Sequence, residues 1–234
     1  MMANSHLIEQ CLSDLTRDHM IADDSSTEMT ASYVGAEEPD GSIDKQAAWI
    51  EKVLSCLGSR AILRQPSIAL ICSVRCPGSI VIQTFDTVRE LRDANVVMIG
   101  GFHSPMEREG LDFLLRGNQP IIICSAKGLG QPRLSAVWRK AIDAGRLLLV
   151  SPFADTVRRT TKAQAQTRNE FVAAISTAVL IPHASPGGKA EAIARKVLKT
   201  GKPLFTFDDP ENHTLLQLGA RPYNIDEIRR KLAG

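Results

Sequence analysis

The sequence predicts an α/β protein built on an open, mostly parallel β-sheet with helices on both faces. Six short apolar segments alternate with helical segments along most of the 234 residues. The segments are apolar almost without interruption, which is typical of strands that helices cover on both sides. Strand–helix alternation at this spacing implies right-handed crossovers between parallel strands, so we expect a Rossmann-like domain.

The elements follow in a regular order. Residues 44–57, DKQAAWIEKVLSCL, predict a helix, because their apolar residues share one helical face and Asp44 precedes them as a cap. The six predicted strands follow, at residues 67–73, 95–101, 120–126, 146–153, 178–184 and 202–208.

Residues 1–43 differ from the rest in composition, and we expect them to form a flexible acidic arm before a single domain at 44–234. Up to Lys45 the chain has ten acidic and two basic residues, a net charge of −8. Because the whole chain carries +2, the remainder carries +10. A basic domain favours an anionic partner such as nucleic acid, a nucleotide or phosphate. Charges scattered over a solvated surface are the alternative.

Composition also excludes some classes. No apolar run approaches the roughly 18 residues that span a bilayer, so no membrane segment is expected. The N-terminus lacks the basic start and apolar core of a signal peptide. Five cysteines without a CxxC pair argue against a disulfide framework and favour the reducing cytoplasm. Cys72 and Cys124 lie in apolar runs and are interpreted as small buried residues.

Ligands of open α/β sheets bind beyond the carboxyl ends of the strands, where the strand order reverses. The segment IGGFHSPMERE, residues 99–109, falls at such an end. Ser104 as N-cap, Pro105 and Glu107 form a capping box for the next helix. Gly100 and Gly101 permit unusual torsions and close approach of another group. His103 is either a surface hydrogen-bonding group or part of a ligand site.

Two other turns have phosphate-binding character. In RCPGS, residues 75–79, Ser79 is expected to cap a helix and Arg75 to offer a bidentate contact. In HASPGGK, residues 183–189, backbone donors precede a helix that begins at Lys189. This is no Walker A motif, since the upstream glycine is missing. A plain loop remains the alternative reading of each turn.

The segment TTKAQAQTRNEF predicts a further helix, with Thr161 and Gln164 spaced as a capping box. Arg168 lies two turns into that helix, beside Asn169. The dinucleotide fingerprint GxGxxG is absent, and no triad or metal-ligand spacing emerges. We therefore expect no cofactor, no metal and no catalytic residues.

The order of these motifs resembles the core of the DNA-processing protein A (DprA/Smf) family over about residues 66–222. The quoted segments that carry the resemblance are ALICSVRCPG, NVVMIGGFHSPMEREGLDFLL, GRLLLVSPF, TRNEFVAAISTAVLIPHASPGGKAEAIA and GKPLFTFDDPENHTLLQLGA. The resemblance implies a protein that binds single-stranded DNA, passes it to the RecA recombinase, forms a homodimer and is not an enzyme.

Individual positions match the family only in part. Ser73 and Arg75 look like its Gly-Ser-Arg, Gly100 like the glycine after its second strand, and Arg168-Asn169 like its Arg-Asn. GFHSPME replaces its second motif, and PGGK loosely replaces a Ser-Gly. His183 stands where the family has a glutamate. The chain thus resembles a divergent branch whose pocket has changed.

Lonely Guy phosphoribohydrolases share this superfamily and give the alternative function, a nucleotide or nucleotide-sugar sensor or hydrolase. Their motifs resemble Arg168 and the Pro-Gly-Gly at 186–188, but the following Gly-Thr is missing and Ala194 replaces the catalytic glutamate. Cleavage of an N-glycosidic bond would lack its acid–base group.

The sequence therefore predicts a phosphate-binding site at the carboxyl edge, with GGFHS and SPGGK facing each other. Its expected ligand is single-stranded DNA or a nucleotide. The predicted binding residues are Ser73, Arg75, Gly100, Gly101, His103, Ser104, Arg168, Asn169, His183, Pro186, Gly187, Gly188 and Lys189.

Overall fold

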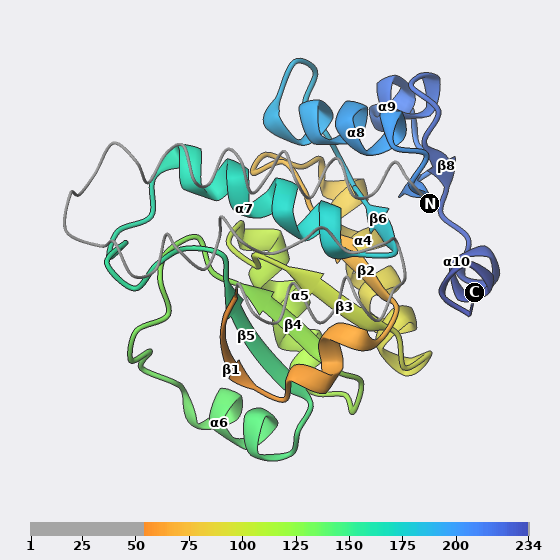
Figure 1. Ribbon diagram of the computed structural model, residues 1–234. Helices are drawn as coiled ribbons and strands as arrows, with labels where there is room; N and C mark the ends of the chain where they lie inside the picture. Colours follow the sequence, from red (N-terminus) through yellow and green to blue (C-terminus); the bar gives the residue numbers. More distant parts are fainter. Residues whose placement is uncertain (1–53, 234) are drawn as a thin grey trace.

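The computed structural model describes residues 54–233 and contains one eight-stranded sheet (Figure 1). The strand order is β1-β5-β4-β3-β2-β6-β7-β8, and every neighbouring pair is parallel except β1 with β5. Each of the six predicted strands contains an observed one, so the predicted fold class is confirmed. The expected acidic arm and residues 44–53 of the expected helix lie outside the described residues.

The elements have the following bounds. The strands are β1 (Ser55–Gly58), β2 (Ser67–Leu70), β3 (Val97–Gly100), β4 (Ile121–Cys124), β5 (Leu147–Ser151), β6 (Ala178–Leu180), β7 (Leu204–Thr206) and β8 (Arg221–Pro222). The α-helices are α4 (Gly78–Asp93), α5 (Pro105–Leu115), α6 (Ala136–Asp143), α7 (Lys162–Ile175), α8 (Lys189–Lys199), α9 (His213–Gln217) and α10 (Ile225–Leu232). Two 3₁₀ helices complete them, η1 (Arg60–Arg64) and η2 (Pro210–Asn212).

The core consists of two apolar layers, one on each face of the sheet. Side chains of η1, α7, α8 and α9 pack on one face, and those of α4, α5, α6 and α10 pack on the other. In Figure 1, α7 crosses in front of the sheet and α5 lies behind it. Successive strand residues alternate between the layers: Ile68 and Leu70 belong to one, and Ala69 and Ile71 to the other. Helices cover both faces of the sheet, which explains why the strands are apolar without interruption.

The predicted helix over 44–57 is wrong at its C-terminal end, because residues 55–58 form β1. This strand pairs antiparallel with β5, Cys56 opposite Val150. Cys56 packs against one apolar layer and Leu57 against the other, so the segment suits a strand buried on both faces. Gly58 ends it at φ 114°, where a Cβ would lie 2.3 Å from the Leu147 carbonyl oxygen. Pairing with a strand about ninety residues later decides the conformation, and local periodicity does not contain that information.

The strand order reverses at β2. From β2 the chain runs through β3, β4 and β5 on one side, then returns to β6, β7 and β8 on the other. The switch point lies between β2 and β6, so the segments that follow these two strands border the expected ligand crevice.

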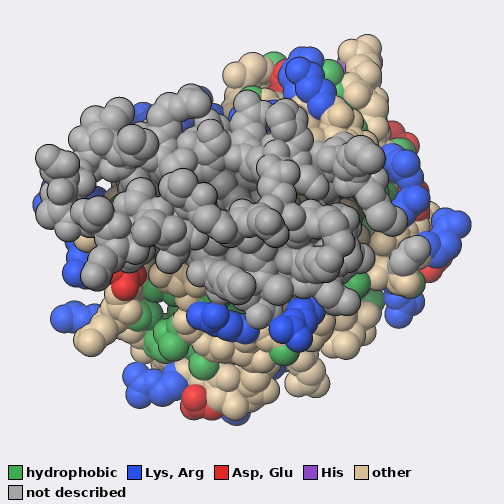
Figure 2. Space-filling view, viewed as in Figure 1, with side chains coloured by type: hydrophobic (Ala, Val, Ile, Leu, Met, Phe, Trp, Pro, Cys, Tyr) green, Lys and Arg blue, Asp and Glu red, His purple; other side chains and the backbone are tan. Residues whose placement is uncertain are grey.

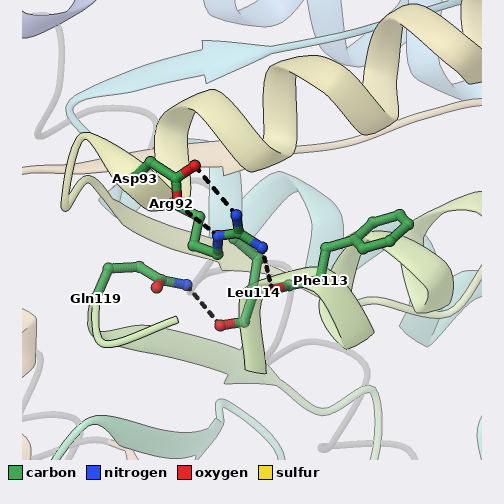
Figure 3. A network of polar contacts seen from close by, with 5 residues as sticks. All are labelled: Arg92, Asp93, Phe113, Leu114 and Gln119. Carbon is green, nitrogen blue, oxygen red and sulfur yellow. Dashed lines mark hydrogen bonds and ion pairs between the residues drawn. The ribbon is translucent and has the colours of Figure 1, made fainter. Parts of the chain in front are cut away.

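Polar side chains secure the end of α5 on the opposite, amino edge of the sheet (Figure 3). The Arg92 guanidinium is paired with the Asp93 carboxylate at 2.7 Å and its Nη1 donates to the Phe113 carbonyl at 3.5 Å. The Gln119 amide donates to the Leu114 carbonyl at 2.9 Å. These side chains add donors to two carbonyls of the last turn, which also accept the backbone amides of Arg116 and Gly117.

Candidate functional site

Three neighbouring loops at the carboxyl edge are hydrogen-bonded into one unit. The Cys72 amide donates to Oε1 of Glu107 at 3.1 Å, which joins the β2 loop to the start of α5. The Ser73 amide donates to the His183 carbonyl at 3.1 Å, and the Ser185 amide donates to Ser73 Oγ at 2.9 Å. The β2 loop therefore lies between GGFHS and SPGGK and bonds to both. β2 lies between β3 and β6. That the two motifs face each other across the crevice stays a prediction.

The capping box predicted at the start of α5 is confirmed. Ser104 Oγ accepts from the Glu107 amide at 3.2 Å, and Glu107 Oε2 accepts from the amides of Ser104 at 3.1 Å and His103 at 2.9 Å. With the Cys72 amide, the buried Glu107 carboxylate thus accepts three backbone N–H groups. The capping box accounts for the bond from the Ser104 amide, and the bond from the Cys72 amide depends on the tertiary fold. The His103 side chain itself is exposed.

The predicted cap at Ser79 is wrong. Helix α4 begins at Gly78 with Pro77 as its N-cap, and no side chain caps it. Pro77 has no N–H to lose and has a fixed φ, so it starts the helix two residues earlier than a serine cap would.

Arg168 is buried, and its guanidinium joins helix α7 to the end of strand β4. Nη1 donates to the Cys124 carbonyl at the end of β4 at 3.1 Å, and Nε donates to the Asn169 side chain at 2.6 Å. A Cβ on Gly101 would lie 1.9 Å from the Arg168 Cζ, so a larger residue at that position requires the guanidinium to move. The predicted cap of α7, Thr161 with Gln164, is confirmed and fixes where this helix begins. A ligand role for Arg168 and Asn169 stays a prediction.

Two backbone donors of the SPGGK turn already have acceptors within the protein. The Gly187 amide donates to Glu191 Oε2 at 2.9 Å, and the Gly188 amide donates to the Ser185 carbonyl at 2.9 Å. Arg195, and then the Gly187 amide, lower the pKa of Glu191. A carboxylate of the protein therefore occupies a position where an anionic ligand was expected. Pro186 and Gly187 remain exposed.

His183 is buried and supports the loops after β6 and β7. Its Nδ1 lies 3.3 Å from Asn212 Oδ1, and the Asn212 amide donates to the Pro182 carbonyl at 2.8 Å. Sequence reasoning did not find Asn212, because a buried asparagine at the end of η2 has no local signature.

Exposed cations gather on the same edge. They follow β2, β4, β5 and β6 or begin the helices after these strands: Arg75, Lys127, Arg133, Arg158, Arg159, Lys162 and Lys189. Asp155 is the single acidic residue on the segments that join each strand from β2 to β6 to its following helix. Its carboxylate accepts a hydrogen bond from the Gly130 amide at 2.8 Å.

The first residues of α7 and α8 lie side by side, since Lys189 Nζ donates to the Lys162 carbonyl at 2.9 Å. Two helix N-termini and two lysines thus add to the positive potential. Figure 2, seen from the same side as Figure 1, shows Lys and Arg side chains at several places around the described part of the visible face.

Two further kinds of feature bear on the described residues, a metal site and a membrane-spanning helix. Among residues 54–233, no group of three or more His, Cys, Asp or Glu side chains is arranged to hold a metal. In the same range no helix is long and apolar enough to cross a membrane. The edge presents exposed cations over loops that are hydrogen-bonded to one another.

Comparisons with known proteins agree with this architecture. The family model of DNA recombination-mediator protein A matches residues 44–232. No curated protein matches the chain. Among solved structures, DNA processing protein A from Helicobacter pylori is similar with a TM-score of 0.63 and 24% identity, over 77% of this chain and 86% of that one. The work on that structure concerns its unique single-stranded DNA binding mode.

DNA processing protein A (DprA) from Streptococcus pneumoniae is similar with a TM-score of 0.61 and 17% identity, over 73% of this chain. The match spans 62% of that protein, so this chain corresponds to part of it. These structures share the fold, and the family model covers most of the sequence. The chain belongs to the DNA recombination-mediator protein A family.

Proposed function

We propose that the chain is a DNA-processing protein that binds single-stranded DNA along the carboxyl edge of its sheet. The observation that carries the proposal is the row of exposed cations from Arg133 to Lys189, with Asp155 as the single acidic residue on the segments that join strands β2 to β6 to their following helices. Neutralised phosphates supply most of the sequence-independent affinity of such a surface. The single-stranded DNA binding named for the Helicobacter pylori protein supports the same ligand class.

The geometry favours a strand over a mononucleotide. A phosphate pocket needs free backbone donors, and the Gly187 and Gly188 amides of the glycine turn are taken by Glu191 and by the Ser185 carbonyl. What remains are side-chain cations spaced over several loops, which suit an extended polyanion that contacts them one phosphate at a time. Glu107 and Glu191 hold the loops that carry Arg75 and Lys189.

From the family resemblance we further propose that the protein works in the cytoplasm as a homodimer and passes DNA to a RecA-type recombinase. Pull-down of purified recombinase with the DNA-loaded protein, and light scattering of the protein alone, test these two points.

Two lysines on one helix provide a matched test of the edge. Lys189 begins α8 at the carboxyl edge, whereas Lys199 ends it at the opposite edge, and both are exposed. We expect Lys189→Ala to lower the slope of log affinity against log salt for a labelled oligothymidylate by about 0.7, the value for one lost phosphate contact. Lys127→Ala should do the same, and Lys199→Ala should keep the parent slope. Parent slopes for both edge variants would refute the proposed surface.

A further inference from the structure

The loops after β2 and β3 expose two side chains that the row of cations does not explain. Val74, in the β2 loop, is 75% exposed, the most of any large apolar side chain in residues 54–233. His103, in the β3 loop, is exposed as well, and no hydrogen bond between described residues engages its ring. A single exposed valine needs no explanation, but an apolar side chain beside an exposed aromatic ring at a ligand edge indicates a contact surface.

The two residues belong to the same short stretch of the carboxyl edge. Strands β2 and β3 are parallel neighbours in the sheet. One carboxylate joins the loops that follow them, because Glu107 accepts the Cys72 amide on Oε1 at 3.1 Å and the His103 amide on Oε2 at 2.9 Å. His103 makes the second of these bonds, and Val74 comes two residues after the first.

Contacts within the protein hold the backbone that carries these side chains. Phe102 has a φ of 47°, a left-handed conformation that bulky residues rarely adopt, and its ring is 5% exposed in an apolar layer. The chain turns sharply there, so that Phe102 is buried whereas His103 is exposed. In the β2 loop, the Ser73 amide and Oγ are both bonded to the loop after β6. A surface held in this way loses little conformational entropy when it binds.

Cations lie on both sides of this stretch. In the strand order β5-β4-β3-β2-β6, Lys127 and Arg133 follow β4, and Lys189 begins the helix after β6. The β2 loop itself contains Arg75, whereas residues 101–104 after β3 include no lysine or arginine. A strand whose phosphates contact these cations would therefore bring the bases between them against the β2 and β3 loops.

We propose that Val74 and His103 form the base-contact surface of the single-stranded DNA site. The His103 ring stacks on one base, as histidine does in other proteins that bind unpaired bases, and Val74 packs beside it. This inference rests on the proposed function and deepens it: the cations attract any polyanion, whereas these two side chains require bases. Stacking accepts every base, because each has a π face, so the surface does not select a sequence.

Strands with and without bases test this assignment. We expect His103→Ala to weaken binding of a labelled oligothymidylate by about fivefold or more, the effect of one lost stacking contact, and to leave binding of an abasic strand of equal length unchanged. Val74→Ser should act in the same sense, and His103→Phe should restore the affinity for oligothymidylate. Lys189→Ala, which removes a phosphate contact, should instead weaken binding of both strands.

Matched controls separate this role from a loss of folding. His213, exposed at the start of α9, and Ile82, 65% exposed on α4, are the same kinds of side chain outside the proposed surface. His213→Ala and Ile82→Ser should bind both strands like the parent, and thermal melts should show that every variant is folded.

Two results would overturn the base-contact surface. One is an equal loss of affinity for both strands in His103→Ala, and the other is parent affinity for oligothymidylate in either His103→Ala or Val74→Ser. A parent protein that binds neither strand would refute the proposed function itself, so the two failures are distinguishable.

Discussion

Glu107 should be among the most important polar residues for stability. Its carboxylate accepts the amides of Cys72, His103 and Ser104, and the residues Cys72 and Ser104 are buried, with 8% and 6% of their surface exposed. Glu107→Ala leaves two buried donors without an acceptor, at about 1–3 kcal/mol each. The free energy of unfolding should therefore fall by about 2–6 kcal/mol, a large part of the 5–15 kcal/mol of an average domain.

Urea unfolding followed by circular dichroism measures this loss, and amide hydrogen exchange locates it. Exchange should quicken at Cys72 and Ser104 first, because these amides lose their acceptor. The stability of Glu107→Gln should fall between those of the parent and Glu107→Ala. The glutamine side chain offers one acceptor oxygen, and its NH2 group, itself a donor, would face a backbone N–H. Glu109, exposed on the same helix, is the matched control, and Glu109→Ala should change stability by at most about 0.5 kcal/mol. If Glu107→Ala unfolds at the parent urea concentration, the carboxylate does not join the loops.

Three further outcomes are expected. Gly101→Ala should destabilise the protein by about 1–3 kcal/mol in thermal melts, because its methyl group would displace the Arg168 guanidinium; an unchanged melting temperature would contradict the close approach. Arg195 lowers the pKa of Glu191 in the folded protein, so the ionised carboxylate stabilises the fold above its unfolded pKa, and this stability is lost as pH falls through the folded pKa. Glu191→Gln should therefore flatten the acid limb of a pH–stability curve. An unaltered acid limb would count against this contribution of Glu191. Deletion of the acidic residues 1–42 should raise affinity for single-stranded oligonucleotides, most at low salt, whereas equal affinities across a salt series would dismiss competition by this segment.

The sequence by itself determined the parallel core of this protein. Strands such as Ile121–Cys124 are apolar on both faces, and that pattern needs no tertiary information to indicate burial between helices. The caps at Ser104 and Thr161 were equally local, because a capping box joins residues three apart. The order of the strand-end motifs sufficed to indicate the family, which the family model confirms.

Only the tertiary structure decided what those motifs touch. The β1 segment became a strand because β5 offered it a partner, and the β2 loop separated the two glycine motifs because β2 lies between β3 and β6. The Arg168 guanidinium donates to the Cys124 carbonyl inside the protein, and the Glu191 carboxylate accepts from the Gly187 amide, a donor that a ligand was expected to use. These contacts join residues far apart in the chain or depend on how a side chain turns, and neither helical nor strand periodicity records such choices.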